Sequence, residues 1–160
     1  MLSSIKKYSN PIFTILLIIV IFTIYYPVQN TDFMLDDFSS IVKSPAIRQL
    51  DIEAIKKAEP MRFIAYYTFA LNFHFSKLTP LHYHITNTII HIIYTLSVLL
   101  LLYSLWKTPA GENFYKNRFP SDSSTSISIT DIEKKYISMA VTFIIAIHPL
   151  STFAISYIVQ

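Results

Sequence analysis

The sequence predicts an all-α integral membrane protein with about three transmembrane helices and a short interfacial helical loop. Of its 160 residues, 52% are hydrophobic and only 14% are charged, whereas a soluble domain carries about 25% charged residues. Three stretches, 8–31, 78–106 and 136–160, contain no Asp, Glu, Lys or Arg. Each of them can supply the ~20 residues with which a helix crosses the hydrocarbon core of a bilayer.

The first span is predicted at about 11–29. It is rich in β-branched, Leu and aromatic residues, and Tyr25 and Tyr26 suit the aromatic belt at a membrane interface. Lys6 and Lys7 precede it, so a cleaved signal peptide is the alternative. No small-residue cleavage pattern follows the apolar run, and this favours an uncleaved anchor.

The second span is predicted at about 81–106, where Trp106 marks its end at an interface. The third is predicted at about 133–148. The dipeptide His148-Pro149 interrupts the third apolar run near its far end, because proline cannot continue a helix without losing a backbone hydrogen bond.

The loop between the first two spans, 27–80, is predicted to be partly helical. Ser44-Pro45 has the form of a helix start, with a capping residue followed by proline. Asp51 is a second candidate cap, for a helix over 52–58.

Two further features complete the predicted loop. Glu53 and Lys57 are four residues apart, a spacing that supports a short helix through an ion pair. The uncharged run 63–76 is rich in aromatic residues. Its 14 residues reach only ~21 Å as a helix, too short for a ~30 Å hydrocarbon core. We therefore expect residues 62–76 to form a helix that lies along the membrane surface.

The placement of basic residues predicts the orientation. Two lysines precede the first span and five Lys or Arg lie in 107–135, and such residues concentrate in cytoplasmic segments. This places the N-terminus and the loop 107–132 in the cytoplasm, and the loop 27–80 on the extracytoplasmic side of a plasma, inner or endoplasmic-reticulum membrane. The loop 27–80 also holds six bases, so the inverse orientation remains the alternative.

Composition narrows the choice of partners. The formal net charge is +3 and the bases are scattered, which argues against nucleic acid as a partner and leaves the lipid bilayer. The absence of cysteine excludes disulfides and thiolate metal sites. With Gly111 as the only glycine, a Gly-rich phosphate loop is excluded as well.

The adjacent carboxylates Asp36 and Asp37 directly follow the first span and are the leading catalytic candidates. Acidic residues beside an apolar span are costly unless they face an aqueous site or a partner. One carboxylate could deprotonate an acceptor hydroxyl as a general base. The second could raise the pKa of the first or bind a divalent cation, although no cofactor is specified by the pattern. The structural alternative is a solvated acidic turn.

Candidate binding residues lie further along the chain. Arg62 opens the aromatic helix and could grip a lipid phosphate with two hydrogen bonds, or could reach to lipid headgroups without a specific role. His84, Asn87 and His91 share one face of the second span. They either hydrogen-bond to a neighbouring helix or line a site near the outer surface, and His148 has the same two interpretations.

The order of these motifs resembles that of a known family. The chain resembles the transmembrane half of the TMTC-like proteins in three segments: FMLDDFSSIVKSPAIR, MRFIAYYTFALNFHFSKLTPLHYHITNTIIH and AIHPLSTFAISYIVQ. In that family an Asp-Asp pair follows the first span, and an Arg-Pro segment precedes a Thr-Phe-x-x-Asn helix. A His-x-x-Asn-x-x-x-His motif opens the second span, and a His-Pro lies past the third. Phe63 departs from the pattern, since the family has proline there.

The resemblance implies a GT-C glycosyltransferase, related to protein O-mannosyltransferases, with C-terminal tetratricopeptide (TPR) repeats. Its donor would be a polyprenyl-phosphate sugar and its acceptor a protein or glycan on the extracytoplasmic side. By the same resemblance, Asp36 or Asp37 would be the general base. The lipid phosphate or substrate would be held by Arg62, His84, Asn87, His91 and His148.

The sequence leaves a second function class open. The chain ends within an apolar run at Gln160, so residues 1–160 are expected to be the N-terminal transmembrane region of a longer protein. The alternative to an enzyme is a non-catalytic membrane anchor or assembly subunit. In that case the acidic pair would be a solvated turn and the histidines would join helices.

Overall fold

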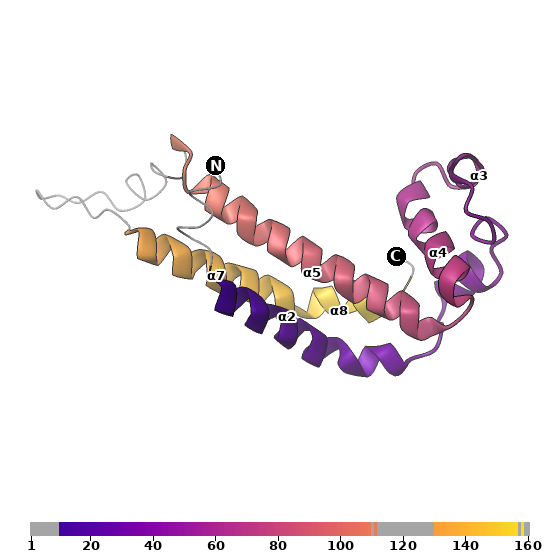
Figure 1. Cartoon of the computed structure of the whole chain (residues 1–160), viewed down its shortest axis with the longest axis horizontal. Coiled ribbons are helices and arrows are strands. Elements are labelled where there is room, and N and C mark those ends of the chain that lie inside the picture. Colours follow the sequence, from indigo (N-terminus) through magenta and orange to yellow (C-terminus); the bar gives the residue numbers. More distant parts are fainter. Residues whose placement is uncertain (1–9, 110, 112–129, 157, 159–160) are drawn as a thin grey trace, which may run out of the picture. The chain divides into compact units, whose positions relative to one another are not determined.

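The protein is helical throughout its regular elements, as predicted. The computed structural model describes residues 10–109, 111, 130–156 and 158, and these contain no β-strand. Within these described residues, the α-helices with defined bounds are α2 (Pro11–Tyr25), α3 (Ile52–Ala58), α4 (Phe63–Ser76), α5 (Pro80–Leu105), α7 (Asp131–Ile147) and α8 (Pro149–Ser156) (Figure 1). A 3₁₀-helix, η1 (Tyr26–Asn30), extends α2, and a π-helix, η2 (Phe38–Val42), lies in the first loop.

The helices form two compact units. The first comprises the chain up to Ile21 together with Ile92–His148, and the second comprises Phe22–His91 together with the residues from Pro149 onward. The long helices α2 and α5 each contribute to both units. Apart from His148, all the predicted site residues belong to the second unit.

Two helices have the length and composition needed to cross a membrane. They are Pro11–Asn30, with 20 residues, and Pro80–Leu105, with 26 residues, and they match the predicted spans 11–29 and 81–106. The predicted third span, 133–148, forms α7, which has 17 residues, about 26 Å at 1.5 Å per residue. The structure therefore shows two candidate spans, and the third stays a prediction.

The long helix α5 has an unusual distribution of side chains. Its buried face carries four polar residues, His84, Thr88, His91 and Thr95, whereas its exposed residues are mainly large and apolar, including Ile93 at 59% exposure. The spacing of the buried residues, i, i+4, i+7 and i+11, follows one face of an α-helix. Helices of soluble proteins show the opposite arrangement.

Helix α7 repeats this arrangement in the first unit. It buries Ser138, Thr142 and Ala146 and exposes apolar residues such as Ile144. Small residues at four-residue spacing allow close approach of a neighbouring helix. Trp106, directly after α5, donates a hydrogen bond from its indole Nε1 to Ser138 Oγ at 2.9 Å, which ties the end of α5 to α7.

A capping box sets the start of α7. The Thr130 hydroxyl accepts a hydrogen bond from Glu133 N at 3.2 Å, and Glu133 Oε2 accepts one from Thr130 N at 2.7 Å. These bonds satisfy backbone donors that the first turn of a helix leaves free. Most of the predicted cytoplasmic loop 107–132 lies outside the described residues, and so do both N-terminal lysines.

Helix α3 forms where its cap predicts. Asp51 Oδ1 accepts hydrogen bonds from Glu53 N at 3.0 Å and Ala54 N at 3.1 Å, and the helix has the predicted bounds. The predicted ion pair between Glu53 and Lys57 was wrong. Glu53 pairs instead with Lys56, at 3.2 Å. The Lys56 ammonium also lies 5.6 Å from the centre of the Phe63 ring, a cation–aromatic contact that favours this side of α3.

The predicted helix start at Ser44-Pro45 was wrong. The chain makes only a turn there, closed by Arg48 N donating to Pro45 O at 3.2 Å. Ile47, within that turn, is completely buried. A helix starting here would have few residues before the cap at Asp51. The burial of Ile47 in the core instead holds this segment as a turn.

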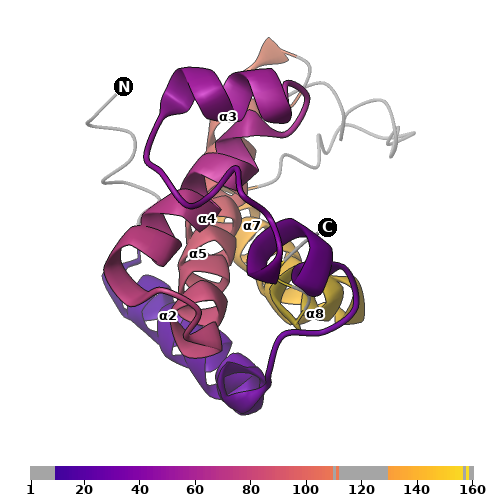
Figure 2. The same cartoon turned by 90° about the vertical axis from the view of Figure 1, so that its right-hand side faces the viewer.

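The loop between the two candidate spans has its own hydrophobic core in the second unit. Ile41, Ile47 and Ile55 are completely buried and pack with residues of α4 and with Tyr83 of α5. Helices α3 and α4 contact each other (Figure 2). The aromatic helix α4 begins one residue later than the predicted helix 62–76 and ends where predicted, with Arg62 at its cap. Its position on the membrane surface stays a prediction. This core fixes α4 against the start of α5.

Candidate functional site

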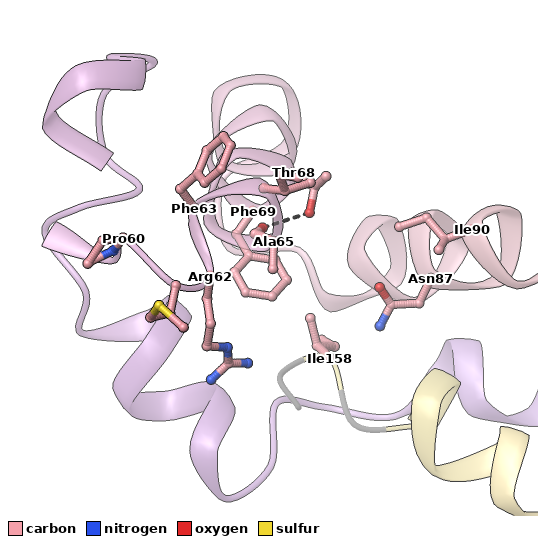
Figure 3. Close-up of a pocket in the computed structure, with 11 residues that line it drawn as sticks. Pro60, Arg62, Phe63, Ala65, Thr68, Phe69, Asn87, Ile90 and Ile158 are labelled. Atoms are coloured by element: carbon pink, nitrogen blue, oxygen red, sulfur yellow. Dashed lines mark hydrogen bonds between the residues drawn. The ribbon is translucent and has the colours of Figure 1, made fainter. Parts of the chain in front are cut away.

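A cavity of ≈ 530 Å³ lies in the second unit. Its walls come from the turn at 60–62, from α4, from α5 and from Ile158 (Figure 3). Most of the lining is apolar. Arg62 and Asn87 supply a charged group and an amide from different walls, and apolar clefts with a few polar groups are the usual form of small-molecule sites.

Arg62 stands at the start of α4, where its carbonyl accepts the hydrogen bond from Tyr66 N at 3.1 Å. Its guanidinium carbon lies 6.0 Å from the centre of the Tyr66 ring, and Tyr66 is buried. The contact restricts the side chain through a cation–aromatic interaction. Met61 beside it is 94% exposed, so this edge of the cavity is open to the surroundings.

Asn87 occupies the opposite wall and is half-buried on α5 (Figure 3). A polar contact between helices fixes this wall against α4. Thr86 donates from its hydroxyl to Asn72 Oδ1 at 2.9 Å, and Asn72 Nδ2 donates to Thr68 O at 3.1 Å. Arg62, directly before α4, and Asn87, on α5, therefore stand on segments that are held together, and a ligand between them meets a preformed site.

The two carboxylates of the acidic pair have different surroundings. Asp37 is 1% exposed, whereas Asp36 is exposed. Asp37 Oδ2 accepts a hydrogen bond from Met34 N at 3.0 Å, and Asp37 N donates to Met34 O at 2.9 Å. This reciprocal pair of bonds closes a turn. Asp37 therefore supports the local backbone, and Asp36 is the carboxylate that an external molecule can reach.

The turn that carries the acidic pair is strained. Leu35 has a φ of 45°, a conformation that costs a non-glycine residue about 1–3 kcal/mol. The π-helix η2 follows directly, with Lys43 N donating to Phe38 O at 2.8 Å. Strained residues and π-turns persist only where their surroundings hold them, and both are frequent at functional sites.

His84 is fully engaged by the protein. It is completely buried, with Nε2 3.1 Å from Thr31 Oγ1 and 3.2 Å from Thr31 O, and with Nδ1 3.4 Å from Ile155 O. Its two ring nitrogens thus face the start of the loop and helix α8. This arrangement corresponds to the structural interpretation of the histidine stripe, in which the side chain joins segments of the fold.

His91 and His148 do not line the cavity. His91 is 6% exposed, and its ring contacts Tyr25 edge-on with the ring centres 5.5 Å apart. His148 is exposed, belongs to the first unit and ends α7 with its N–H directed at Ile145 O. Of the five predicted binding residues, the structure brings Arg62 and Asn87 together in the cavity.

The sequence reasoning missed several residues of the cavity. Ile90 lies one helical turn beyond Asn87 and could have been found from that spacing. Ile158 reaches the cavity from the far end of the chain, which no local pattern indicates. Among the described residues, no three His, Asp or Glu side chains gather closely enough to hold a metal ion.

Comparison with protein-family models, with curated proteins and with solved structures finds no match to this chain. The resemblance to the TMTC-like proteins therefore rests on the order and spacing of the sequence motifs and stays a prediction.

Proposed function

We propose that this chain is the N-terminal membrane portion of a GT-C-type glycosyltransferase that uses a polyprenyl-phosphate sugar. The observation that carries the proposal is the cavity, which combines one guanidinium and one amide with apolar walls. A lipid phosphate needs both features, a cation for its head and an apolar surface for its chain. The same unit carries the exposed carboxylate of Asp36.

The proposal includes three membrane spans. Helix α2 together with η1 has sufficient length, as does α5, and α7 would be the third. The support for α7 is its face of Ser138, Thr142 and Ala146, buried while apolar residues are exposed. Exposed apolar faces and buried small or polar faces suit helices that pack against one another in lipid. The loop 27–80 would then lie on the extracytoplasmic side.

Arg62 and Asn87 would bind the donor phosphate. The planar guanidinium offers paired N–H groups to phosphate oxygens, and the amide nitrogen offers another donor. The ring of Tyr66, 6.0 Å from the guanidinium carbon, limits the freedom of Arg62, so less entropy is lost when the phosphate binds. The apolar walls would take the first isoprene units of the lipid.

Asp36 would act as the general base, with Asp37 holding the turn. The acceptor hydroxyl oxygen attacks the anomeric carbon of the sugar and forms the new C–O bond. The bond between that carbon and the phosphate oxygen breaks, and polyprenyl phosphate leaves with the electron pair. The hydroxyl proton passes to the Asp36 carboxylate. A positioned base of this kind contributes about 10²–10⁴-fold to the rate.

A non-catalytic anchor is the second candidate, and one observation favours it. Asp37 and His84 direct their polar atoms at neighbouring backbone groups, as they would in a purely structural protein. An anchor has no need of a cation at a cavity, however, so binding of lipid phosphate separates the two functions.

Binding of a photoreactive polyprenyl phosphate to the full-length protein in phosphatidylcholine nanodiscs tests the proposal. Arg62→Gln should weaken binding by about 10–100-fold, because a hydrogen bond to a charged group contributes ~1.5–3 kcal/mol. The matched control is Lys57→Gln, which removes an exposed cation from the neighbouring helix α3. Equal binding by both variants and the wild type would refute the phosphate site and favour the anchor.

A further inference from the structure

We propose that Arg48 is a positioning residue, which clamps the π-helix η2 and thereby fixes the direction of the Asp36 carboxylate. Arg48 does not line the cavity and is not part of the acidic pair. The clamp itself follows from contacts in the second unit. Its consequence for catalysis rests on the proposed function.

The Arg48 side chain binds the end of η2. Its Nη2 donates to Ile41 O at 3.4 Å and to Val42 O. The carbonyls of the last turn of a helix lack backbone donors and need other partners. Arginine suits this task because its planar group carries several N–H donors in a fixed geometry, whereas lysine offers a single mobile ammonium.

The same guanidinium contacts helix α4. Its carbon lies 4.3 Å from the centre of the Phe73 ring, and α4 forms part of the cavity wall through residues nearer its start. Ile41, within η2, and Ile47, in the turn that follows, are completely buried in the core that α4 shares. Arg48 therefore fastens η2 to the helix that carries the cavity.

The clamp determines where Asp36 points. A π-turn contains one residue more than an α-turn, and one residue corresponds to ~100° of rotation about a helix axis. If η2 relaxed to an α-helix while the residues after it stayed in place, Ile41 would rotate out of the core, and the residues before it would rotate by about this angle. Asp36, directly before Asp37 at the cap of η2, would then turn away from its present direction.

Thiol labelling tests the clamp without any assay of transfer. Residues 1–160 contain no cysteine, so Ile41→Cys and Ile55→Cys each introduce the only thiol of this segment, and labelling is measured on the peptide that carries it. Both positions are completely buried in the same core cluster. In the full-length protein, Arg48→Gln should raise the labelling rate of Ile41→Cys about tenfold or more and leave that of Ile55→Cys unchanged. The control Lys43→Gln, an exposed lysine of the same segment, should change neither rate.

The kinetics of sugar transfer test the consequence. Arg48→Gln should lower kcat about 10–100-fold, since a displacement near 1 Å can cost ~10²-fold in rate. The KM for the polyprenyl-phosphate donor should stay unchanged, because Arg62 and Asn87 remain in place. Arg48→Lys should behave like Arg48→Gln, because an ammonium does not bind two carbonyls and cover Phe73 together.

The outcomes separate the claims. Equal increases at both thiols in Arg48→Gln would show general loosening of the core and overturn the clamp, as would no increase at Ile41→Cys. Local labelling with wild-type kcat would overturn the positioning role. If the wild-type protein transfers no sugar, the proposed function and the positioning role fail together, while the two thiols still decide whether Arg48 clamps η2.

Discussion

Asp36 and Asp37 should respond in opposite ways to the same substitution. Asp36 is exposed, so Asp36→Asn should change the free energy of unfolding by less than about 0.5 kcal/mol. If Asp36 is the base, the same change should lower sugar transfer by ~10²–10⁴-fold, because an amide does not accept the proton. That loss corresponds to about 2.7–5.4 kcal/mol of activation free energy.

Asp37 should show the reverse pattern. Its Oδ2 accepts the Met34 N–H at 3.0 Å while the side chain is 1% exposed. Asp37→Ala removes this acceptor and should destabilise the protein by about 1–2 kcal/mol. Asp37→Asn keeps an oxygen acceptor and should retain most of the stability and a measurable rate. Asp32→Asn is the exposed control and should affect neither quantity.

Two assays on the full-length protein in detergent provide the comparison. Thermal unfolding gives the stabilities, and transfer from a radiolabelled polyprenyl-phosphate hexose gives the rates. Loss of transfer in Asp37→Asn with near-normal transfer in Asp36→Asn would refute the assignment of the base by exposure. Normal transfer in both single variants and in the double variant would refute carboxylate catalysis altogether.

Three further substitutions test the fold. Asp51→Ala should destabilise the protein by about 0.5–2 kcal/mol through loss of the α3 cap, whereas unchanged thermal unfolding would show that tertiary packing alone holds α3. Lys77 has a φ of 56°, so Lys77→Gly should be about 1 kcal/mol more stable than Lys77→Ala; equal stability would contradict strain there. Ser138→Ala should shift the fluorescence of Trp106, the only tryptophan in the sequence, and cost about 1 kcal/mol through the lost hydrogen bond; an unchanged spectrum would argue against that contact.

The sequence predicted those parts of the fold that depend on local signals. The cap at Asp51 and the bounds of α3 follow from one side chain and its next three residues. The same kind of signal failed at Ser44-Pro45, because the burial of Ile47 in a core formed by distant helices overrides it. The π-helix η2 was not predictable either, since its end is held by Arg48, six and seven residues away.

The candidate site was predictable only where its residues stand out in the local sequence. Arg62 and Asn87 stood out as polar groups in apolar surroundings, and the structure brings both to one cavity. The partners of His84, Thr31 and Ile155, lie 53 and 71 residues away along the chain. The sequence alone therefore left open whether His84 binds a ligand or joins helices. The difference in burial between Asp36 and Asp37 likewise depends on the turn at Leu35.

Consumption of a polyprenyl-phosphate hexose is the most direct test of the central claim. The full-length protein in liposomes would receive the radiolabelled donor and a membrane-protein fraction as acceptor, and the release of polyprenyl phosphate would be measured. We predict saturable release that Asp36→Asn lowers by ~10²–10⁴-fold and that Arg62→Gln weakens through a higher KM. Binding of the donor without release, or equal release by the wild type and Asp36→Asn, would contradict the account.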